Sequence, residues 1–161
     1  RRVCIANTHI HWDPECADVK LWQSFILLQV DSQELEKLVM HRNLPLVLCG
    51  DFNSMTDSSV FELLTTERAQ VYQLHWSVSC VLFLSSFFPF VLSTPVFVCP
   101  AGHFVGTLDY IFYSKNHLVH HSVLDSDKED VLKRHTALPS PQFSSDHICL
   151  VTELDWMADS S

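Results

Sequence analysis

Four short stretches of the chain carry acids, amides and imidazoles where apolar, strand-like runs give way to loops. They are Asn7–Pro14, Gly50–Ser54, Leu108–Phe112 and Ser145–His147. Side chains at a strand end leave the core, so acids and imidazoles from several strands can converge on one ligand. The joint occurrence of the four stretches predicts metal-dependent hydrolysis of a phosphodiester.

The first candidate pair is Asp51 and Asn53, which follow the apolar run Leu46–Cys49. They lie two residues apart at a strand end, so their side chains can point to the same side. A carboxylate there can bind Mg²⁺ or take a proton from an attacking water, and the amide can hydrogen-bond a phosphate oxygen. The purely structural alternative is an Asx turn that closes the strand.

The second candidate pair is Asp146 and His147, which are adjacent and would face opposite ways in an extended segment. One could meet a metal while the other meets the phosphate. His147 needs an acid that fixes its tautomer, and Asp109 is the candidate because it too lies at a strand end. An oriented imidazole can stabilise the developing charge or protonate a leaving oxygen. A surface tripeptide without a catalytic role is the alternative.

Two further histidines, His9 and His11, alternate on one predicted strand face, a spacing that also suits zinc. No third soft ligand stands at a suitable spacing, so the sequence favours an oxygen-ligated ion over zinc. The remaining histidines lack such context, and we expect them to be solvated or capping: His41, His75, His103, His117, His120, His121 and His135.

The elements that must position these groups are strands mixed with covering helices, which predicts layers of the α+β or α/β kind. The predicted strands are Val3–Thr8, Leu46–Cys49, Leu108–Tyr113, His117–Leu124 and Ile148–Leu154. Apolar residues from Val19 to Leu38 recur at helical spacing, which predicts a helix over Ala17–Met40. A second helix follows the capping residues Thr56, Asp57 and Ser58, and a short charged one covers Asp127–Arg134.

Length and charge bound the possible functions. A chain of 161 residues with 47% hydrophobic residues is long enough for one packed domain and argues against disorder. Ten Lys plus Arg against nineteen Asp plus Glu give a net charge of −9, the wrong sign for gripping nucleic acid by a broad basic face. An acidic nuclease remains possible, since its carboxylates hold cations that neutralise the phosphate.

The cysteines are scattered, without a Cys-x-x-Cys pair, at positions Cys4, Cys16, Cys49, Cys80, Cys99 and Cys149. This pattern disfavours a disulfide framework or a structural zinc site and predicts reduced thiols inside the cell. The chain opens with Arg1-Arg2-Val3-Cys4 directly in a strand pattern, without an initiator Met or signal peptide. We therefore expect a fragment that begins inside a domain.

One segment departs from this rhythm. Ser77–Cys99 has no charged residue and approaches a transmembrane span in hydropathy, although Pro89, Pro95 and five serines interrupt it. The alternatives are a buried or aberrant insert, the product of an unspliced or mispredicted gene segment, and a membrane-associating helix. The missing basic flanks make membrane association the less favoured of these.

The four strand-end stretches, Asn7–Pro14, Gly50–Ser54, Leu108–Phe112 and Ser145–His147, together resemble the C-terminal half of the endonuclease/exonuclease/phosphatase superfamily domain. A second set of stretches consists of Ala6–Glu15, Asp18–Gln23, Gly106–Tyr113 and Thr136–Pro141. Within the superfamily this set resembles the poly(A)-specific deadenylase subunit of the carbon-catabolite-repression–Not complex. The resemblance covers about residues 1–65 and 104–156. It implies the C-terminal half of one such domain over residues 1–161, with an atypical apolar insert at about 77–99. The implied fold is α+β, a partial two-sheet β-sandwich flanked by helices.

The resemblance also implies residue roles. Asp51 would orient or deprotonate the water, Asn53 would bind the scissile phosphate and His9 would contact it. Asp146 would lie at the metal site together with Asp51. His147, paired with Asp109, would stabilise the transition state. Pro14 and Phe104 match the positions that sandwich an adenine base, and stacking of that kind contributes about 1–3 kcal/mol per base.

The implied function is a 3′–5′ poly(A) exoribonuclease that acts in mRNA decay and releases 5′-AMP. The expected cofactor is Mg²⁺, with two ions in the intact domain and Mn²⁺ as a substitute. The expected partners are poly(A) RNA and a Not-type scaffold. The expected location is the cytoplasm, with the nucleus as an additional location. The alternatives are a phosphodiesterase acting on 2′,5′-oligoadenylate or another nucleotide, and a non-catalytic remnant.

Two departures from the family pattern bear on activity. The family's main Mg²⁺-ligating glutamate belongs to an N-terminal half, and Glu15, Glu34 and Glu36 do not stand in its motif. The region between Asn53 and Asp109, where further strands and a substrate loop are expected, holds the apolar segment instead. We therefore expect little or no nuclease activity from this chain alone.

Overall fold

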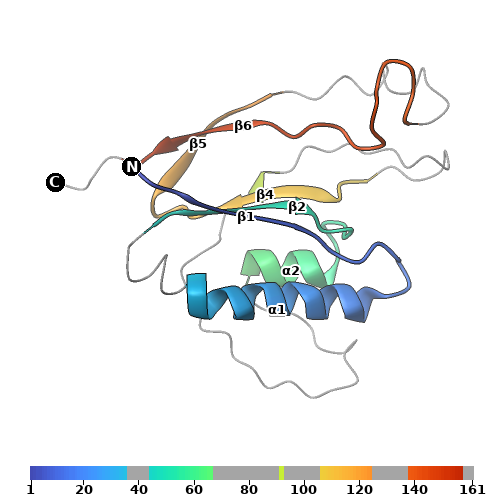
Figure 1. Ribbon diagram of the computed structural model, residues 1–161, viewed down its shortest axis with the longest axis horizontal. Coiled ribbons are helices and arrows are strands. Elements are labelled where there is room, and N and C mark those ends of the chain that lie inside the picture. The colour runs from blue at the N-terminus through green and yellow to red at the C-terminus, as the bar shows by residue number, and fades with distance from the viewer. Residues whose placement is uncertain (36–43, 67–90, 93–105, 125–137, 158–161) are drawn as a thin grey trace.

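The computed structural model describes residues 1–35, 44–66, 91–92, 106–124 and 138–157. Within these ranges the chain forms three layers, which are a pair of helices, a four-stranded sheet and a two-stranded sheet. Figure 1 shows α1 (Ala17–Leu35) and α2 (Ser59–Thr66) on one side of the larger sheet. Strands β5 (Leu118–Val123) and β6 (Thr152–Trp156) lie on its other side. The predicted α+β arrangement with two sheets is confirmed.

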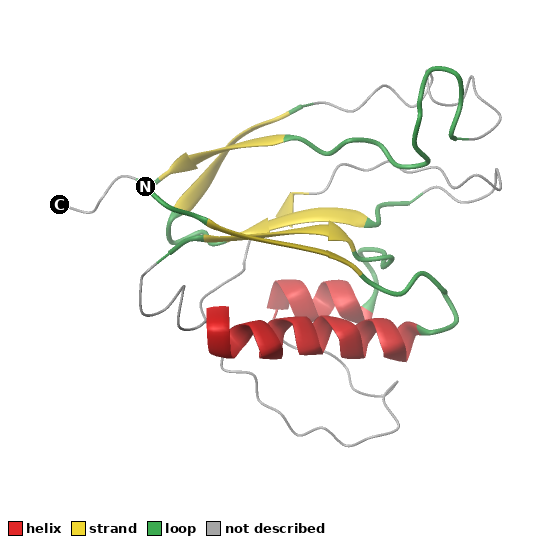
Figure 2. Cartoon of the chain, in the orientation of Figure 1, coloured by secondary structure: helices red, strands yellow, loops and turns green. Residues whose placement is uncertain are grey.

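The larger sheet has the strand order β1-β2-β4-β3. Strands β1 (Cys4–His9) and β2 (Leu46–Asp51) run parallel, and β4 (Asp109–Tyr113) runs antiparallel to β2. A parallel pair needs a crossover connection, and α1 supplies it between β1 and β2, as Figure 2 shows. The strands and helices predicted for these residues are confirmed.

The smaller sheet pairs β5 with β6 in antiparallel fashion. The strand predicted over Ile148–Leu154 was placed too early, because pairing begins at Thr152, opposite Val123. Residues 138–151 contain no strand. They form the loop that carries Asp146 and His147, so the apolar residues before Thr152 belong to a functional loop rather than to the sheet.

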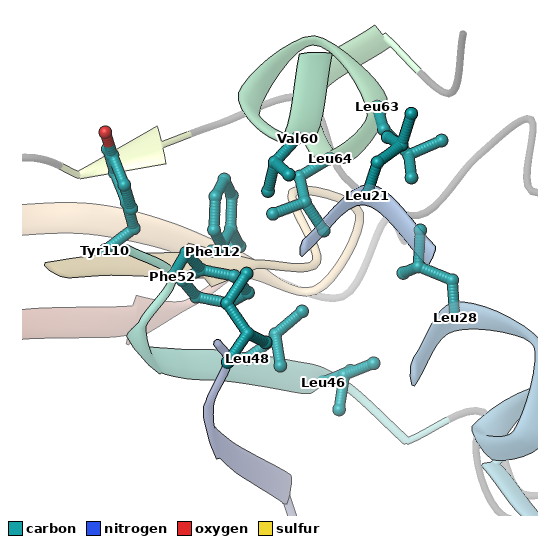
Figure 3. Close-up of a cluster of buried hydrophobic side chains, with 11 residues drawn as sticks. Leu21, Leu28, Leu46, Leu48, Phe52, Val60, Leu63, Leu64, Tyr110 and Phe112 are labelled. Atoms are coloured by element: carbon teal, nitrogen blue, oxygen red, sulfur yellow. The ribbon is translucent and has the colours of Figure 1, made fainter. Parts of the chain in front are cut away.

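The hydrophobic core lies between the helices and the larger sheet (Figure 3). Leucines of both helices pack there against alternate residues of β2 and β4 and against the Phe52 ring, which is 1% exposed. The packed side chains are Leu21, Leu28, Leu46, Leu48, Phe52, Val60, Leu63, Leu64, Tyr110 and Phe112. This packing leaves the opposite face of the larger sheet for other contacts.

The buried face of α1 differs from the apolar stripe that indicated the helix. Leu21 is 2% exposed, whereas Trp22 and Ile26 are 45% and 38% exposed. Trp22 instead stacks on Phe25, with ring centroids 5.4 Å apart. Helical spacing thus identified the element correctly, but α1 turns two polar residues, Lys20 and Ser24, toward the protein interior.

The predicted cap of α2 is confirmed at Ser58. Its hydroxyl accepts a hydrogen bond from the Phe61 amide at 3.2 Å, which satisfies one free N–H of the first turn. A short loop therefore separates the end of β2 from α2, and that loop carries Asn53.

Several predictions fall outside the described residues: the end of the first helix beyond Leu35, the charged helix over Asp127–Arg134, Phe104 and most of Ser77–Cys99. From the apolar segment, β3 (Val91–Leu92) is described and pairs with Ile111 and Phe112 of β4. Neither of the two described helices is long and apolar enough to cross a bilayer.

The β1–β2 pairing requires glycine at position 50. Gly50 has a φ of 144°, and a Cβ there would overlap the carbonyl oxygen of Thr8, its partner in the parallel register. Neither the backbone angle nor the space admits a side chain. The step from β2 to Asp51 therefore depends on this residue.

We predict that Gly50→Ala lowers the free energy of unfolding by more than about 3 kcal/mol, because strain and a backbone clash add. Urea unfolding followed by circular dichroism measures this loss. Val47→Ala, a half-buried truncation on the same strand, is the control and should cost about 1 kcal/mol. Equal losses in the two variants would contradict the close approach.

Candidate active site

The candidate site begins as a row of three side chains across three strands. In the sheet register His9 pairs with Asp51, and Asp51 pairs with Asp109. Side chains alternate along a strand, and residues an odd number of positions away on the same strands face the helical core, among them Ala6 on β1 and Tyr110 on β4. His9, Asp51 and Asp109 therefore lie together on the face opposite the helices, at one end of the sheet.

Asp51 is the most buried member of the row, with 11% of its side chain exposed. Its Oδ1 accepts a hydrogen bond from the Asn53 amide at 2.8 Å. Its Oδ2 lies 3.4 Å from His9 Nε2 and 3.6 Å from His147 Nε2. The carboxylate is thus oriented on one oxygen by the backbone and flanked on the other by two imidazoles.

His147 reaches the row from the loop that precedes β6. Its Nδ1 lies 2.7 Å from Asp109 Oδ2, and its amide donates to the Ser145 hydroxyl at 3.0 Å. This contact places a proton on Nδ1 of His147, which donates it in a hydrogen bond to Asp109. The other ring nitrogen, Nε2, lies on the side of Asp51. The predicted pairing of His147 with Asp109 is therefore present.

The two partners of this pair have raised pKa values for different reasons. Burial lowers the His147 pKa, but the hydrogen bond to Asp109 and the charges of Asp109, Asp51 and Asp146 outweigh it and raise the pKa. Burial raises the Asp109 pKa, and the hydrogen bond from His147 only partly offsets that. The imidazole is therefore protonated more readily than an isolated histidine.

The raised His147 pKa links protonation to stability. Since the folded state holds this proton more tightly, the stabilisation is complete below the ordinary pKa of 6.5 and is lost as pH rises through the folded-state value.

Asn53 closes the strand and borders the site at the same time. It has a φ of 43°, a left-handed conformation that asparagine tolerates better than most residues. Its side-chain amide donates to the Ile10 carbonyl at 3.0 Å, and its backbone amide orients Asp51. The hydrogen bond from the Asn53 amide to Asp51 is the Asx turn that the sequence offered as the structural alternative, and the catalytic role of the two residues stays a prediction.

Lys20 is a site-bordering residue that sequence reasoning missed. It is 7% exposed, and its Nζ donates to the Asn53 carbonyl at 2.9 Å. A buried ammonium bound to this carbonyl fixes the loop after Asp51. The signal was available in the sequence, because Lys20 lies four residues before Ser24 and eight before Leu28, on one face of a helix.

Other predicted site residues lie apart from the row. Asp146 is outside the cluster of metal-ligating atoms, although its charge acts on His147. Pro14 is exposed in the loop between β1 and α1, and Phe104 is not among the described residues. His9 and His11 do not share a strand face as predicted, because β1 ends at His9 and His11 belongs to the loop.

The residues present fit a divalent cation. One ligand atom from each of Asp51, Asp109 and His147 lies within 4.8 Å of the others. Two carboxylates supply the oxygen ligands that Mg²⁺ and Mn²⁺ prefer. Asp51 and Asp109 would supply these oxygens, and His147 is the third potential ligand.

The endonuclease/exonuclease/phosphatase family model matches residues 29–147 of this chain, a span that includes Asp51, Asp109 and His147. The chain belongs to this family.

Three relatives match nearly all of the chain. Carbon catabolite repressor protein 4 homolog 1 of Arabidopsis thaliana is 33% identical over 96% of this chain and 30% of its own length. The CCR4-Not complex 3′-5′-exoribonuclease subunit Ccr4 of Saccharomyces cerevisiae is 30% identical over 94% of this chain and 20% of its own length. Human 2′,5′-phosphodiesterase 12 is 29% identical over 97% and 26%. The chain thus spans less than a third of the length of these relatives.

A solved structure supports the family fold. The crystal structure of ANGEL2, a 2′,3′-cyclic phosphatase, superimposes with a TM-score of 0.69 at 23% identity. The match covers 94% of this chain and 56% of that one. The α+β sandwich is therefore the family's own.

We predict that Asp109→Asn lowers the pKa of His147. The substitution removes the negative charge that raises this pKa, whereas burial, which lowers it, is unchanged. Histidine C2-proton NMR during a pH titration measures this. The chain offers a matched control, since His121 Nδ1 lies 2.6 Å from Asp155 Oδ2 on the other sheet, and that bond raises the His121 pKa. Asp155→Asn should change only the pKa of His121. An unchanged His147 pKa in Asp109→Asn would refute the pairing of His147 with Asp109.

Proposed function

We propose that this chain carries the hydrolytic centre of a Mg²⁺-dependent 3′–5′ poly(A) exoribonuclease that releases 5′-AMP. The observation that carries the proposal is the convergence of Asp51, Asp109 and His147 from β2, β4 and the loop before β6. The relation to the yeast 3′-5′-exoribonuclease subunit supports the polarity and an RNA substrate. When bound, the cation would polarise the phosphate and stabilise its developing charge.

In this proposal each residue has a role that follows from its contacts. Asp51, oriented by the Asn53 amide, accepts the proton of the attacking water through Oδ2. His147, held by Asp109 at Nδ1, presents Nε2 to the phosphate and donates a proton or hydrogen bond there. His9, with 69% of its side chain exposed, is free to contact a phosphate oxygen.

The proposal extends to the surroundings of this reaction. Poly(A) RNA is the proposed substrate, and a Not-type complex is the proposed scaffold. The proposed location is the cytoplasm, with the nucleus as an additional location. Pro14, exposed in the loop between β1 and α1, and Phe104 are the proposed adenine-stacking residues. Asp146 stays a proposed metal ligand, although it does not belong to the group of ligand atoms formed by Asp51, Asp109 and His147. We also propose that the chain alone is inactive, since the family's main glutamate ligand has no counterpart in it.

We predict that a chimera joining the N-terminal half of the Arabidopsis relative's nuclease domain to this chain shortens 5′-labelled poly(A) with Mg²⁺. His147→Ala should lower the rate about 10²–10⁴-fold, because general acid–base assistance is lost. His121→Ala, which removes an exposed histidine paired elsewhere, is the control and should retain activity. Full activity in His147→Ala, or strong activity of the 161 residues alone, would each contradict a part of the proposal.

A second candidate substrate is 2′,5′-oligoadenylate, which the 29% identity to human 2′,5′-phosphodiesterase 12 favours. We predict that, in a mixture of equal concentrations, the chimera consumes poly(A) first and releases 5′-AMP from it. Chromatography of the products measures both reactions in one tube. Faster consumption of the 2′,5′-linked oligomer would transfer the proposal to that substrate.

The third alternative, a non-catalytic remnant, concerns the chain alone. The contacts of Asp51 with two imidazoles and a backbone amide favour a formed site over a remnant. Thermal melting of the 161 residues with Mg²⁺ and AMP distinguishes them. A raised melting temperature supports a formed site, and an unchanged one supports the remnant.

A further inference from the structure

A second group of metal-ligating side chains lies outside the active-site row, in the loop between β1 and α1. One ligand atom from each of His11, Asp13 and Cys16 lies within 4.8 Å of the others, and all three residues are half-buried. They share no residue with the cluster of Asp51, Asp109 and His147. Cys16 is free of any disulfide. Spacing along the sequence did not join this thiol to His11.

Hydrogen bonds donated by the backbone amides of the loop hold it in this shape. The Cys16 amide donates to the Asp13 carbonyl at 3.1 Å, and the Glu15 amide donates to Asp13 Oδ1 at 2.9 Å. The His11 amide donates to Gln23 Oε1 of α1 at 2.8 Å. These bonds orient the Asp13 carboxylate and leave its second oxygen for another ligand, which is how outer contacts support metal ligands.

We propose that His11, Asp13 and Cys16 bind a zinc ion. An imidazole nitrogen, a carboxylate oxygen and a thiolate sulfur are the ligand types that zinc takes in proteins, whereas Mg²⁺ and Ca²⁺ take oxygen. Three protein ligands leave the fourth tetrahedral position to water. Zinc bonds of about 2.0–2.3 Å bring such ligands within about 4 Å of one another. Side-chain rotation on one loop provides that contraction.

This site is separate from the proposed hydrolysis and does not depend on it. Its effect would be on the loop, which carries Trp12, 70% exposed, and Pro14. The proposed ligands flank Trp12 and Pro14 in the sequence, so a bound metal would hold this part of the loop in one conformation.

Cobalt substitution tests the proposal on the reduced 161-residue chain. Co²⁺ bound to a thiolate gives a sulfur-to-metal charge-transfer band, which a site made of carboxylates and imidazole cannot give. We predict this band at one equivalent of Co²⁺ and its loss when one equivalent of Zn²⁺ is added. Cys16→Ser should abolish the band. His11→Ala should weaken Co²⁺ binding by more than the 10–100-fold that loss of an outer-shell partner costs.

Two control variants locate the signal. Cys149→Ser removes an exposed thiol elsewhere in the chain and should retain the band. Asp109→Asn disrupts the active-site cluster and should retain it as well. Absence of a thiolate band in the wild-type chain, or a band that survives Cys16→Ser with circular dichroism unchanged, would overturn the proposal. The proposal requires the thiolate band in the wild-type chain. This first test does not depend on whether the variants fold.

Discussion

The close approach of β1 to β2 at Thr8 and Gly50 fixes the register on which the active-site row depends. Where the two backbones meet, no side chain fits, and the next pair in the register is His9 with Asp51. A shift of one residue would turn Asp51 toward the helical core, since side chains alternate across a sheet. The arrangement of the candidate site therefore rests on a backbone contact between two residues outside the site.

The row is completed by elements whose burial serves the site. Packing of α1 and α2 against one face of the larger sheet leaves the other face to His9, Asp51 and Asp109. Lys20 extends this link, because its buried ammonium holds the carbonyl of Asn53 and thereby the turn that orients Asp51. Stability and function are coupled here through a few hydrogen bonds on a sharply turning backbone.

The charge of the chain bears on its proposed action on a polyanion. With a net charge of −9, the molecule has no excess of basic residues to attract phosphate. The site instead alternates acids with imidazoles, and His147 gains a proton readily because three carboxylates act on it. In the proposed function, this local pairing and a divalent cation held by the carboxylates would take the place of a broad positive surface.

The amino-acid sequence by itself determined the family by its motifs, and most of the described strands and both described helices by their periodicity, because these are local properties. It also singled out Asp51, Asp109 and His147 as candidates for one site. It did not determine which face of α1 is buried, where β6 begins, or that Lys20 holds Asn53. Nor did spacing join Cys16 to His11, since the fold of a loop brings them together. Only the tertiary structure decided these points, because they depend on packing between segments distant in sequence and on the path of the backbone between them.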